Sequence, residues 1–276
     1  MNKPEIIFYD LDGTSLNFCK RFSKKTIEYF NQVSQEIMMI PCTGRGNVPS
    51  THEIFKSVDA HTYILGNGSQ IFHNDELIFQ ASIDYHILLD LLQVLKKYKY
   101  TIIVNSELHT KTFSTSRIIR NLARIFANVQ KHSIESFRAL IQSENQIFKI
   151  LLIPLKRKQR AEIQKQIKEK LPSTINIAAT GHNHSYFEIT AQNATKGKAI
   201  KFLSEYLNKD LSKTVHFGDS MNDASAKGYV NKLYAMKNAS QNLKNIADEV
   251  IPYKSRKAGL GRFLLEKFCK IKSPKE

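Results

Sequence analysis

Residues 10–14 read Asp10-Leu11-Asp12-Gly13-Thr14 and directly follow the apolar run Ile6-Ile7-Phe8-Tyr9. Such a short apolar run is typical of a strand that is buried on both faces. Two carboxylates two residues apart in a turn can face one pocket, where one attacks phosphorus and the other handles protons. Gly13 lets the backbone turn sharply. The alternative is an acidic turn without chemistry, but its place at the end of a strand favours a functional site.

Outward from this stretch, the chain alternates apolar strands with amphipathic helices. Strands are predicted at residues 37–40, 63–65, 187–190 and 215–217, and helices begin near Ser23 and Lys198. This alternation favours an α/β fold with a Rossmann-like, mostly parallel sheet. A hairpin is expected at residues 70–79, and a further helix after Asp219. Open sheets of this kind bind their ligands at the carboxyl ends of the strands.

The middle of the chain carries an alternation of its own. Helices are predicted at residues 85–97, 117–127 and 158–170, and strands at 102–104, 148–153 and 175–178. We therefore predict a core formed by residues 1–81 and 186–276, with an α/β insertion at residues 82–185.

Three more groups of residues follow predicted strands or open a helix. The hydroxyl of Thr43 and the N–H of Gly44 are suited to clamp a phosphate, although Thr-Gly also marks ordinary turns. Lys196 can neutralise a transferring phosphoryl group, although a surface lysine is the simpler interpretation of that position alone. Asp219 and Asp223 can complete an oxygen-rich Mg²⁺ site with Asp10, or can merely cap a helix.

Taken together and in this order, these motifs resemble those of the haloacid dehalogenase superfamily of phosphohydrolases. Gly66-Asn67-Gly68-Ser69, Phe187-Glu188-Ile189-Thr190 and Ala235-Met236-Lys237-Asn238-Ala239 are similar to its Cof-like branch. In that branch a large α/β cap lies between the second and third motifs. The resemblance implies that the insertion at residues 82–185 is this cap domain and selects the substrate.

The resemblance also implies a Mg²⁺-dependent phosphatase acting on phosphate monoesters of small metabolites, such as sugar phosphates. Asp10 would form an aspartyl-phosphate, while Asp12 would protonate the leaving oxygen and then deprotonate water. Asp10, the main-chain carbonyl of Asp12, and Asp219 would hold Mg²⁺, with Asp223 supporting the site from behind. The residues implied to contact the phosphate are Leu11, Thr43, Gly44, Lys196 and Asn222.

The sequence departs from the family pattern in three places. Ala191-Gln192-Asn193-Ala194 stands where the family has Pro and Gly before the lysine, and Ser225-Ala226 replaces an apolar Pro-Met pair. Ala258-Gly259-Leu260 stands in for Asp-Gly-Val. None of these changes removes a catalytic group.

Other functions remain open at this stage. A phosphomutase would use the same aspartyl-phosphate, and a non-catalytic domain that binds phosphate esters could keep the fold. A contact between Asn67 and substrate is as plausible as a simple turn. His182 and His184 are two residues apart without a third ligand nearby, which argues against zinc, but they could face the substrate.

Composition limits location and partners. The 276 residues carry a formal charge of +16, but their lysines and arginines are scattered, so we expect no specific nucleic-acid partner. No apolar run reaches the ~18 residues of a membrane helix. Cys19, Cys42 and Cys269 are too few and too widely spaced for a disulfide framework. We expect a cytoplasmic protein that binds a small phosphorylated metabolite without a membrane partner, and its oligomeric state stays open.

Overall fold

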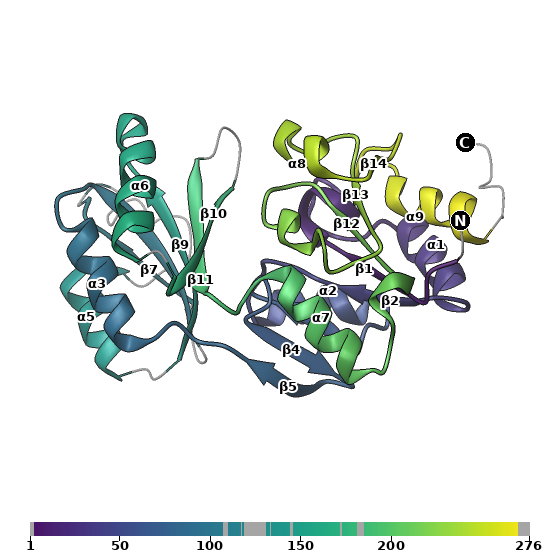
Figure 1. Cartoon of the computed structure of the whole chain (residues 1–276), viewed down its shortest axis with the longest axis horizontal. Helices are drawn as coiled ribbons and strands as arrows, with labels where there is room; N and C mark the ends of the chain where they lie inside the picture. The colour runs from purple at the N-terminus through teal and green to yellow at the C-terminus, as the bar shows by residue number, and fades with distance from the viewer. Residues whose placement is uncertain are drawn as a thin grey trace. The chain divides into compact units, whose positions relative to one another are not determined.

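The computed structural model describes residues 3–106, 110–116, 118, 131–132, 134–143, 146–171, 173–180 and 185–269. The chain divides into two compact units (Figure 1). The first unit joins Met1–Gln80 with Thr195–Glu276, and the second is the single segment Ala81–Ala194. Apart from Ile118, the helix predicted at residues 117–127 lies outside the described residues, as do His182 and His184.

The first unit is built on a five-stranded sheet in the order β14-β13-β12-β1-β2, in which all neighbouring strands are parallel. This is the Rossmann-like core that the sequence predicts. Its strands are β1 (Ile6–Tyr9), β2 (Met38–Pro41), β12 (Thr214–Gly218), β13 (Lys232–Ala235) and β14 (Glu249–Val250).

Strand β1 lies inside this sheet, and all four of its residues are buried. Tyr9 is in register with Pro41 of β2 on one side and with Phe217 of β12 on the other. The chain therefore continues from β1 to a strand on one side and returns much later to the strand on the other side. Such a switch in strand order creates a crevice at the carboxyl ends, which is where α/β sheets bind ligands.

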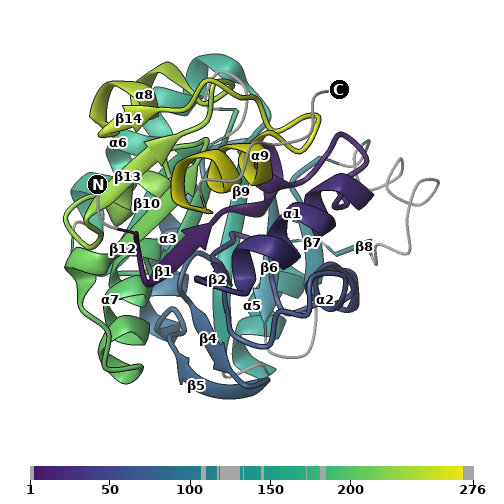
Figure 2. The same ribbon diagram turned by 90° about the vertical axis from the view of Figure 1, so that its right-hand side faces the viewer.

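The helices of the first unit begin at predictable caps. Ser23 accepts a hydrogen bond from the backbone N–H of Thr26 at the start of α1 (Lys24–Ser34), and Thr195 caps α7 (Lys196–Tyr206) in the same way. Helix α1 packs beside α9 (Gly259–Leu264), as Figure 2 shows. The remaining helices of this unit are α2 (Pro49–Lys56) and α8 (Gln241–Ile246).

The predicted hairpin is present in a three-stranded antiparallel sheet of β3 (Tyr63–Leu65), β4 (Gln70–His73) and β5 (Glu76–Gln80). Asn74 and Asp75 form its two-residue turn, and both have positive φ, as a tight hairpin turn requires. Residues 63–65 are a strand as predicted, but they pair antiparallel with β4. An isolated parallel bridge joins Ile64 to Cys42, the residue after β2.

The second unit contains a six-stranded sheet in the order β10-β11-β9-β6-β7-β8. Its pairings are antiparallel except for the parallel pair β7–β8. Helices α3 (Tyr85–Leu95), α5 (Ile134–Ser143) and α6 (Arg160–Lys170) lie together along one side of this sheet (Figure 1). The strands are β6 (Tyr100–Ser106), β7 (Thr110–Ser114), β8 (Lys131–His132), β9 (Ile147–Pro154), β10 (Ile175–Thr180) and β11 (Tyr186–Ala191).

Two expectations from the sequence need correction. Residues 186–194 were predicted to belong to the core, but β11 pairs with β9 and β10, which places this segment in the second unit. An apolar strand does not show by itself which sheet it joins. The helix predicted after Asp219 is only a single turn at Asp223–Ala226. In addition, no helix in the described ranges is both long and apolar enough to cross a membrane.

Candidate active site

The predicted acidic residues meet at the carboxyl ends of two adjacent strands. Asp10 follows β1, and its backbone N–H donates to the carbonyl of Phe217 in β12 at 2.9 Å. Asp219 follows β12 directly, so these two carboxylates come from neighbouring strand ends. Oxygen atoms of Asp10, Asp219 and Asp223 all lie within 4.8 Å of one another. The topology thus produces an acidic cluster at the switch point of the sheet.

Lys196 joins this cluster from the first turn of α7. Its Nζ donates to Asp10 Oδ1 and to Asp223 Oδ1, both at 2.6 Å, and its side chain is fully buried. Burial alone would lower the pKa of Lys196, but the charges of the two aspartates outweigh it and hold the pKa above its usual range. Lys196 is therefore a fixed cation beside Asp10.

Asp223 is saturated with hydrogen bonds. Its Oδ1 accepts from Lys196 and from Nε2 of His216 at 2.8 Å, while its Oδ2 accepts from the backbone N–H groups of Asp219 and Ser220. Burial would raise the pKa of Asp223, but Lys196 and His216 outweigh it, so its pKa lies far below the ordinary value. Asp223 therefore acts as an ionised anchor for Lys196.

His216 lies in β12 and is fully buried. Burial lowers its pKa. Because a carboxylate only accepts hydrogen bonds, Nε2 carries the proton toward Asp223. Within the part of the chain that the structure describes, its Nδ1 has no hydrogen-bond partner, which fits the neutral tautomer. His216 is thus a neutral donor that helps to fix Asp223.

Asp219 differs from the other two aspartates. Among the described residues, no donor or cation lies within bonding distance of its carboxylate. Burial and the nearby charge of Asp10 raise the pKa of Asp219 to about 8. Burial likewise raises the pKa of Asp10 to about 7, against the opposing effect of Lys196. This arrangement of carboxylate oxygens with uncompensated negative charge suits a hard divalent cation.

Gly13 allows this approach of Asp219. Its φ is +81°, and a Cβ atom there would lie 2.2 Å from Asp219 Oδ2. A side chain at this position would therefore collide with the carboxylate. The loop's glycine serves both the turn and the space that Asp219 needs.

Asp12 points to a different partner. Its two carboxylate oxygens accept from Arg45 Nε at 2.6 Å and from Arg45 Nη2 at 2.8 Å. Partial burial would raise the pKa of Asp12, but the hydrogen bonds and charge of Arg45 outweigh it and lower the pKa below its usual value. The carboxylate of Asp12 is thus held ionised by a two-pronged ion pair.

The predicted phosphate contacts also lie at the strand ends. The backbone N–H of Cys42 donates to the carbonyl of Tyr9, which places Thr43 and Gly44 immediately beyond the strand next to β1. The hydroxyl of Thr43 is buried and accepts from the backbone N–H of Arg45. Asn222 donates through Nδ2 to Oδ1 of Asn67 at 3.1 Å. The side chain of Leu11 is buried in the turn after Asp10, so its backbone is the part that can contact a phosphate.

Sequence reasoning missed three residues of this site. Arg45 directly follows Thr43 and Gly44 but was given no role, and His216 occupies what looks like an apolar strand position. Asn238 donates through Nδ2 to the carbonyl of Gly13 at 2.7 Å and thereby holds the turn after β1 from a later loop. A polar residue within an apolar strand was the signal for His216, and for Asn238 the signal was its place in a stretch similar to the Cof-like branch, although no role was given to it.

Comparison with known proteins shows the family to which the chain belongs. The sequence profile of haloacid dehalogenase-like hydrolases matches residues 7–264. The phosphatase YwpJ of Bacillus subtilis is 27% identical over 272 residues, which cover 89% of this chain and 94% of YwpJ. A putative phosphatase of Haemophilus influenzae is 24% identical over 95% of this chain and 97% of its own length.

Solved structures share the fold. A haloacid dehalogenase-like hydrolase from B. subtilis superposes with a TM-score of 0.78 at 23% identity, covering 95% of this chain and 99% of that one. The subclass IIB sugar phosphatase BT4131 gives a TM-score of 0.78 at 21% identity, covering 97% and 100%.

The family match and the named relatives define an enzyme of the phosphatase class. The chain belongs to the haloacid dehalogenase-like hydrolase family. The family predicted from the four motifs is thereby confirmed.

Proposed function

We propose that this protein is a Mg²⁺-dependent phosphatase that hydrolyses phosphate monoesters of small metabolites, sugar phosphates or similar compounds. One observation carries the proposal: buried Lys196 lies 2.6 Å from both Asp10 and Asp223, which form an acidic cluster with Asp219. This centre can neutralise a phosphoryl group while it presents a carboxylate nucleophile. The sugar phosphatase BT4131 shares the fold and supports the substrate class.

The residues that would hold Mg²⁺ are Asp10, Asp219 and the main-chain carbonyl of Asp12. Asp223 is the third acidic residue of the cluster, but its four hydrogen bonds leave it little capacity as a ligand. When bound, Mg²⁺ would neutralise charge on the phosphoryl oxygens and orient the ester.

The chain's own residues carry out two transfers. In the first, an oxygen of Asp10 attacks phosphorus, the ester P–O bond breaks, and the leaving oxygen takes a proton from Asp12. In the second, Asp12 removes a proton from water, whose oxygen attacks the aspartyl-phosphate. This step releases inorganic phosphate and restores both carboxyl groups to their starting states.

The ion pair with Arg45 affects whether Asp12 can act as an acid in the first transfer. Asp12 must hold a proton to act as an acid, whereas its ion pair with Arg45 favours the ionised form. The pair must therefore loosen when substrate binds, which follows if an anionic group of the substrate competes for the guanidinium. In the second transfer the same pair supports Asp12 as a base.

The other predicted residues position the phosphate. The backbone after Leu11, the hydroxyl of Thr43 and the N–H of Gly44 would bind phosphoryl oxygens, together with Asn222. Lys196 would neutralise the phosphoryl charge, with Asp223 and His216 fixing its position.

The second unit would select the substrate as a cap domain. We predicted this domain at residues 82–185, and the compact unit spans Ala81–Ala194. We propose the cytoplasm as the location, which suits three cysteines that are all free thiols.

The test is phosphate release from a panel of phosphorylated metabolites, with Mg²⁺ and again with EDTA. Mg²⁺-dependent release is expected, and Asp10→Asn should lower it by about 10³-fold or more while the protein stays folded. Undiminished release by Asp10→Asn would refute the mechanism. Transfer of phosphate to a second hydroxyl of a sugar, rather than to water, would instead show a phosphomutase.

A further inference from the structure

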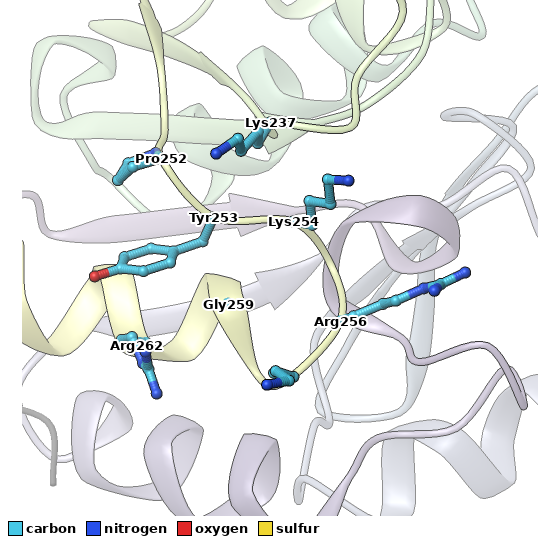
Figure 3. Close-up of a pocket in the computed structure, with 8 residues that line it drawn as sticks. Lys237, Pro252, Tyr253, Lys254, Arg256, Gly259 and Arg262 are labelled. Atoms are coloured by element: carbon cyan, nitrogen blue, oxygen red, sulfur yellow. The ribbon is translucent and has the colours of Figure 1, made fainter. Parts of the chain in front are cut away.

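A basic pocket of about 370 Å³ opens on the first unit near the C-terminal end of the described chain. Figure 3 shows its lining side chains around the segment that leads from Pro252 into α9. None of the lining residues belongs to the set proposed for catalysis. The lining residues are Lys237, Pro252, Tyr253, Lys254, Arg256, Lys257, Gly259 and Arg262.

The charge of this pocket is one-sided. Five of its lining residues are lysine or arginine, and none is acidic. The side chains of Lys237, Lys254 and Arg256 are exposed, and within the described ranges no carboxylate forms an ion pair with any of the three. Like charges around one concavity repel one another unless an anion lies between them. The uncompensated charge therefore favours an anionic ligand.

The backbone that presents these cations is held in one conformation. The N–H of Lys237 donates to the carbonyl of Tyr253, and the N–H of Gly259 donates to the carbonyl of Arg256. Lys257 and Ala258 both have a φ of +56°, a left-handed conformation that non-glycine residues adopt only where the surroundings enforce it. A rigid loop loses little conformational freedom when it binds a ligand.

One wall of the pocket is aromatic and equally fixed. The Tyr253 hydroxyl donates to Glu266 Oε2 at 2.8 Å, and the guanidinium of Arg262 lies 5.5 Å from the centre of the Tyr253 ring. The ring contact places Arg262 at the pocket wall, but the same tyrosine also binds the Glu266 carboxylate, so the charge that attracts an anion comes from the three exposed cations.

We propose that this pocket is a second anion site, separate from the catalytic centre, which binds a small molecule carrying two or more phosphate groups. Its volume lies at the small end of ligand pockets, which fits a compact polyanion better than a bulky cofactor. Several spread cations can each meet a different phosphate group, so a polyphosphate gains more than a single phosphate does.

The site lies next to the catalytic turn without sharing residues with it. Asn238 accepts through Oδ1 from the N–H of Ser255, within the pocket's loop, and donates through Nδ2 to the carbonyl of Gly13. Because the Asn238 side chain joins the two loops, anion binding in the pocket has to be measured separately from phosphatase turnover.

The experiment is calorimetric titration of the full chain with inorganic tripolyphosphate and, separately, with orthophosphate, in metal-free buffer with EDTA. The test variant is Lys237→Gln, Lys254→Gln, Arg256→Gln. The matched control is Lys24→Gln, Lys56→Gln, Lys168→Gln, which removes three exposed cations elsewhere. Thermal unfolding checks that both variants are folded.

We expect the wild type and the control to bind tripolyphosphate more tightly than orthophosphate. The pocket variant should bind tripolyphosphate more weakly, on the order of 100-fold. Unchanged affinity in the pocket variant would place binding elsewhere and overturn the proposal. Equal losses in both variants would show a mere effect of net charge, and absence of binding by wild type at millimolar ligand would also overturn it. None of these readouts depends on phosphatase activity.

Discussion

Arg45 donates hydrogen bonds to both carboxylate oxygens of Asp12, through Nε at 2.6 Å and Nη2 at 2.8 Å. Asp12 lies in the turn after β1 and Arg45 in the loop after β2, so this ion pair joins the segments that carry the first two motifs. It also favours the ionised form of Asp12, the residue proposed as general acid and base. The pH dependence of turnover should therefore respond to Arg45.

Replacing Arg45 by Ala should shift the alkaline limb of the kcat/KM–pH profile, which reports the free enzyme, to higher pH. Arg45 lowers the pKa of Asp12, so its loss raises that pKa and keeps the acid protonated in more alkaline solution. The measurement is steady-state kinetics over a pH series. Lys20→Ala is a matched control, since exposed Lys20 lies 3.8 Å from Asp12, and it should leave the limb nearly unmoved. A limb that stays in place without Arg45 would contradict this role.

Lys196→Met should destabilise the protein strongly at alkaline pH and less so in acid. The change leaves Asp10 and Asp223 buried without their cation, at a cost of about 3–5 kcal/mol. Without Lys196 the pKa values of both carboxyl groups rise, so protonation at lower pH removes the unpaired charge and restores part of the stability. Urea unfolding at about pH 8 and about pH 5 measures the difference. An equal loss at both pH values would count against the buried ion pair.

His216→Leu should lower kcat by about tenfold with little change in KM. Leucine fills the buried space but removes the Nε2–H that steadies Asp223, and through it Lys196. His216→Gln can keep an N–H donor in this direction and should recover part of kcat. If both variants lose activity equally while folding normally, the hydrogen bond is not what matters at this position.

Mg²⁺ should raise the melting temperature more at about pH 8.5 than at about pH 6. The pKa values of Asp10 and Asp219 are raised to about 7 and about 8, so the folded state binds their protons more tightly than the unfolded chain. Their contribution to stability is therefore full below about pH 4 and is lost as pH rises through about 7 to 8. A cation compensates the ionised pair at high pH.

Asp219→Asn supplies the control for that measurement. It removes one of the two raised carboxyl groups, so the metal-free variant should lose less stability with rising pH and gain little from Mg²⁺. A variant that gains as much as wild type would show that Mg²⁺ binds somewhere else.

The core of the site was predictable because its residues sit in short linear motifs at strand ends. Asp10 and Asp219 each follow an apolar strand, and parallel neighbours bring such ends together without any knowledge of side-chain packing. Lys196 came from the family motif rather than from its surroundings, since a lysine that opens a helix is usually exposed. The structure buries it completely.

What was missed depends on partners distant in sequence. Arg45 reaches Asp12 only after β1 and β2 are paired, and Asn238 reaches Gly13 from near the opposite end of the chain. The sheet to which residues 187–190 belong was predicted wrongly for the same reason. This segment could form a strand in either sheet, and only its pairing with β9 and β10 decides between them.

The order of strands in the sheet also determines when each strand can find its neighbours during synthesis. Strand β1 emerges first and finds β2 soon afterwards, but its other edge pairs Ile6 with Thr214, near the opposite end of the chain. At about 5–20 residues per second, that edge waits on the order of 10–40 s. During this interval the ribosome carries an apolar strand with an open edge, a form prone to mispairing. Meanwhile Ala81–Ala194, a continuous segment, can complete its own sheet. The sheet that carries Asp10 can therefore be completed only after residue 214 has been synthesised, although the strand before Asp10 is translated first.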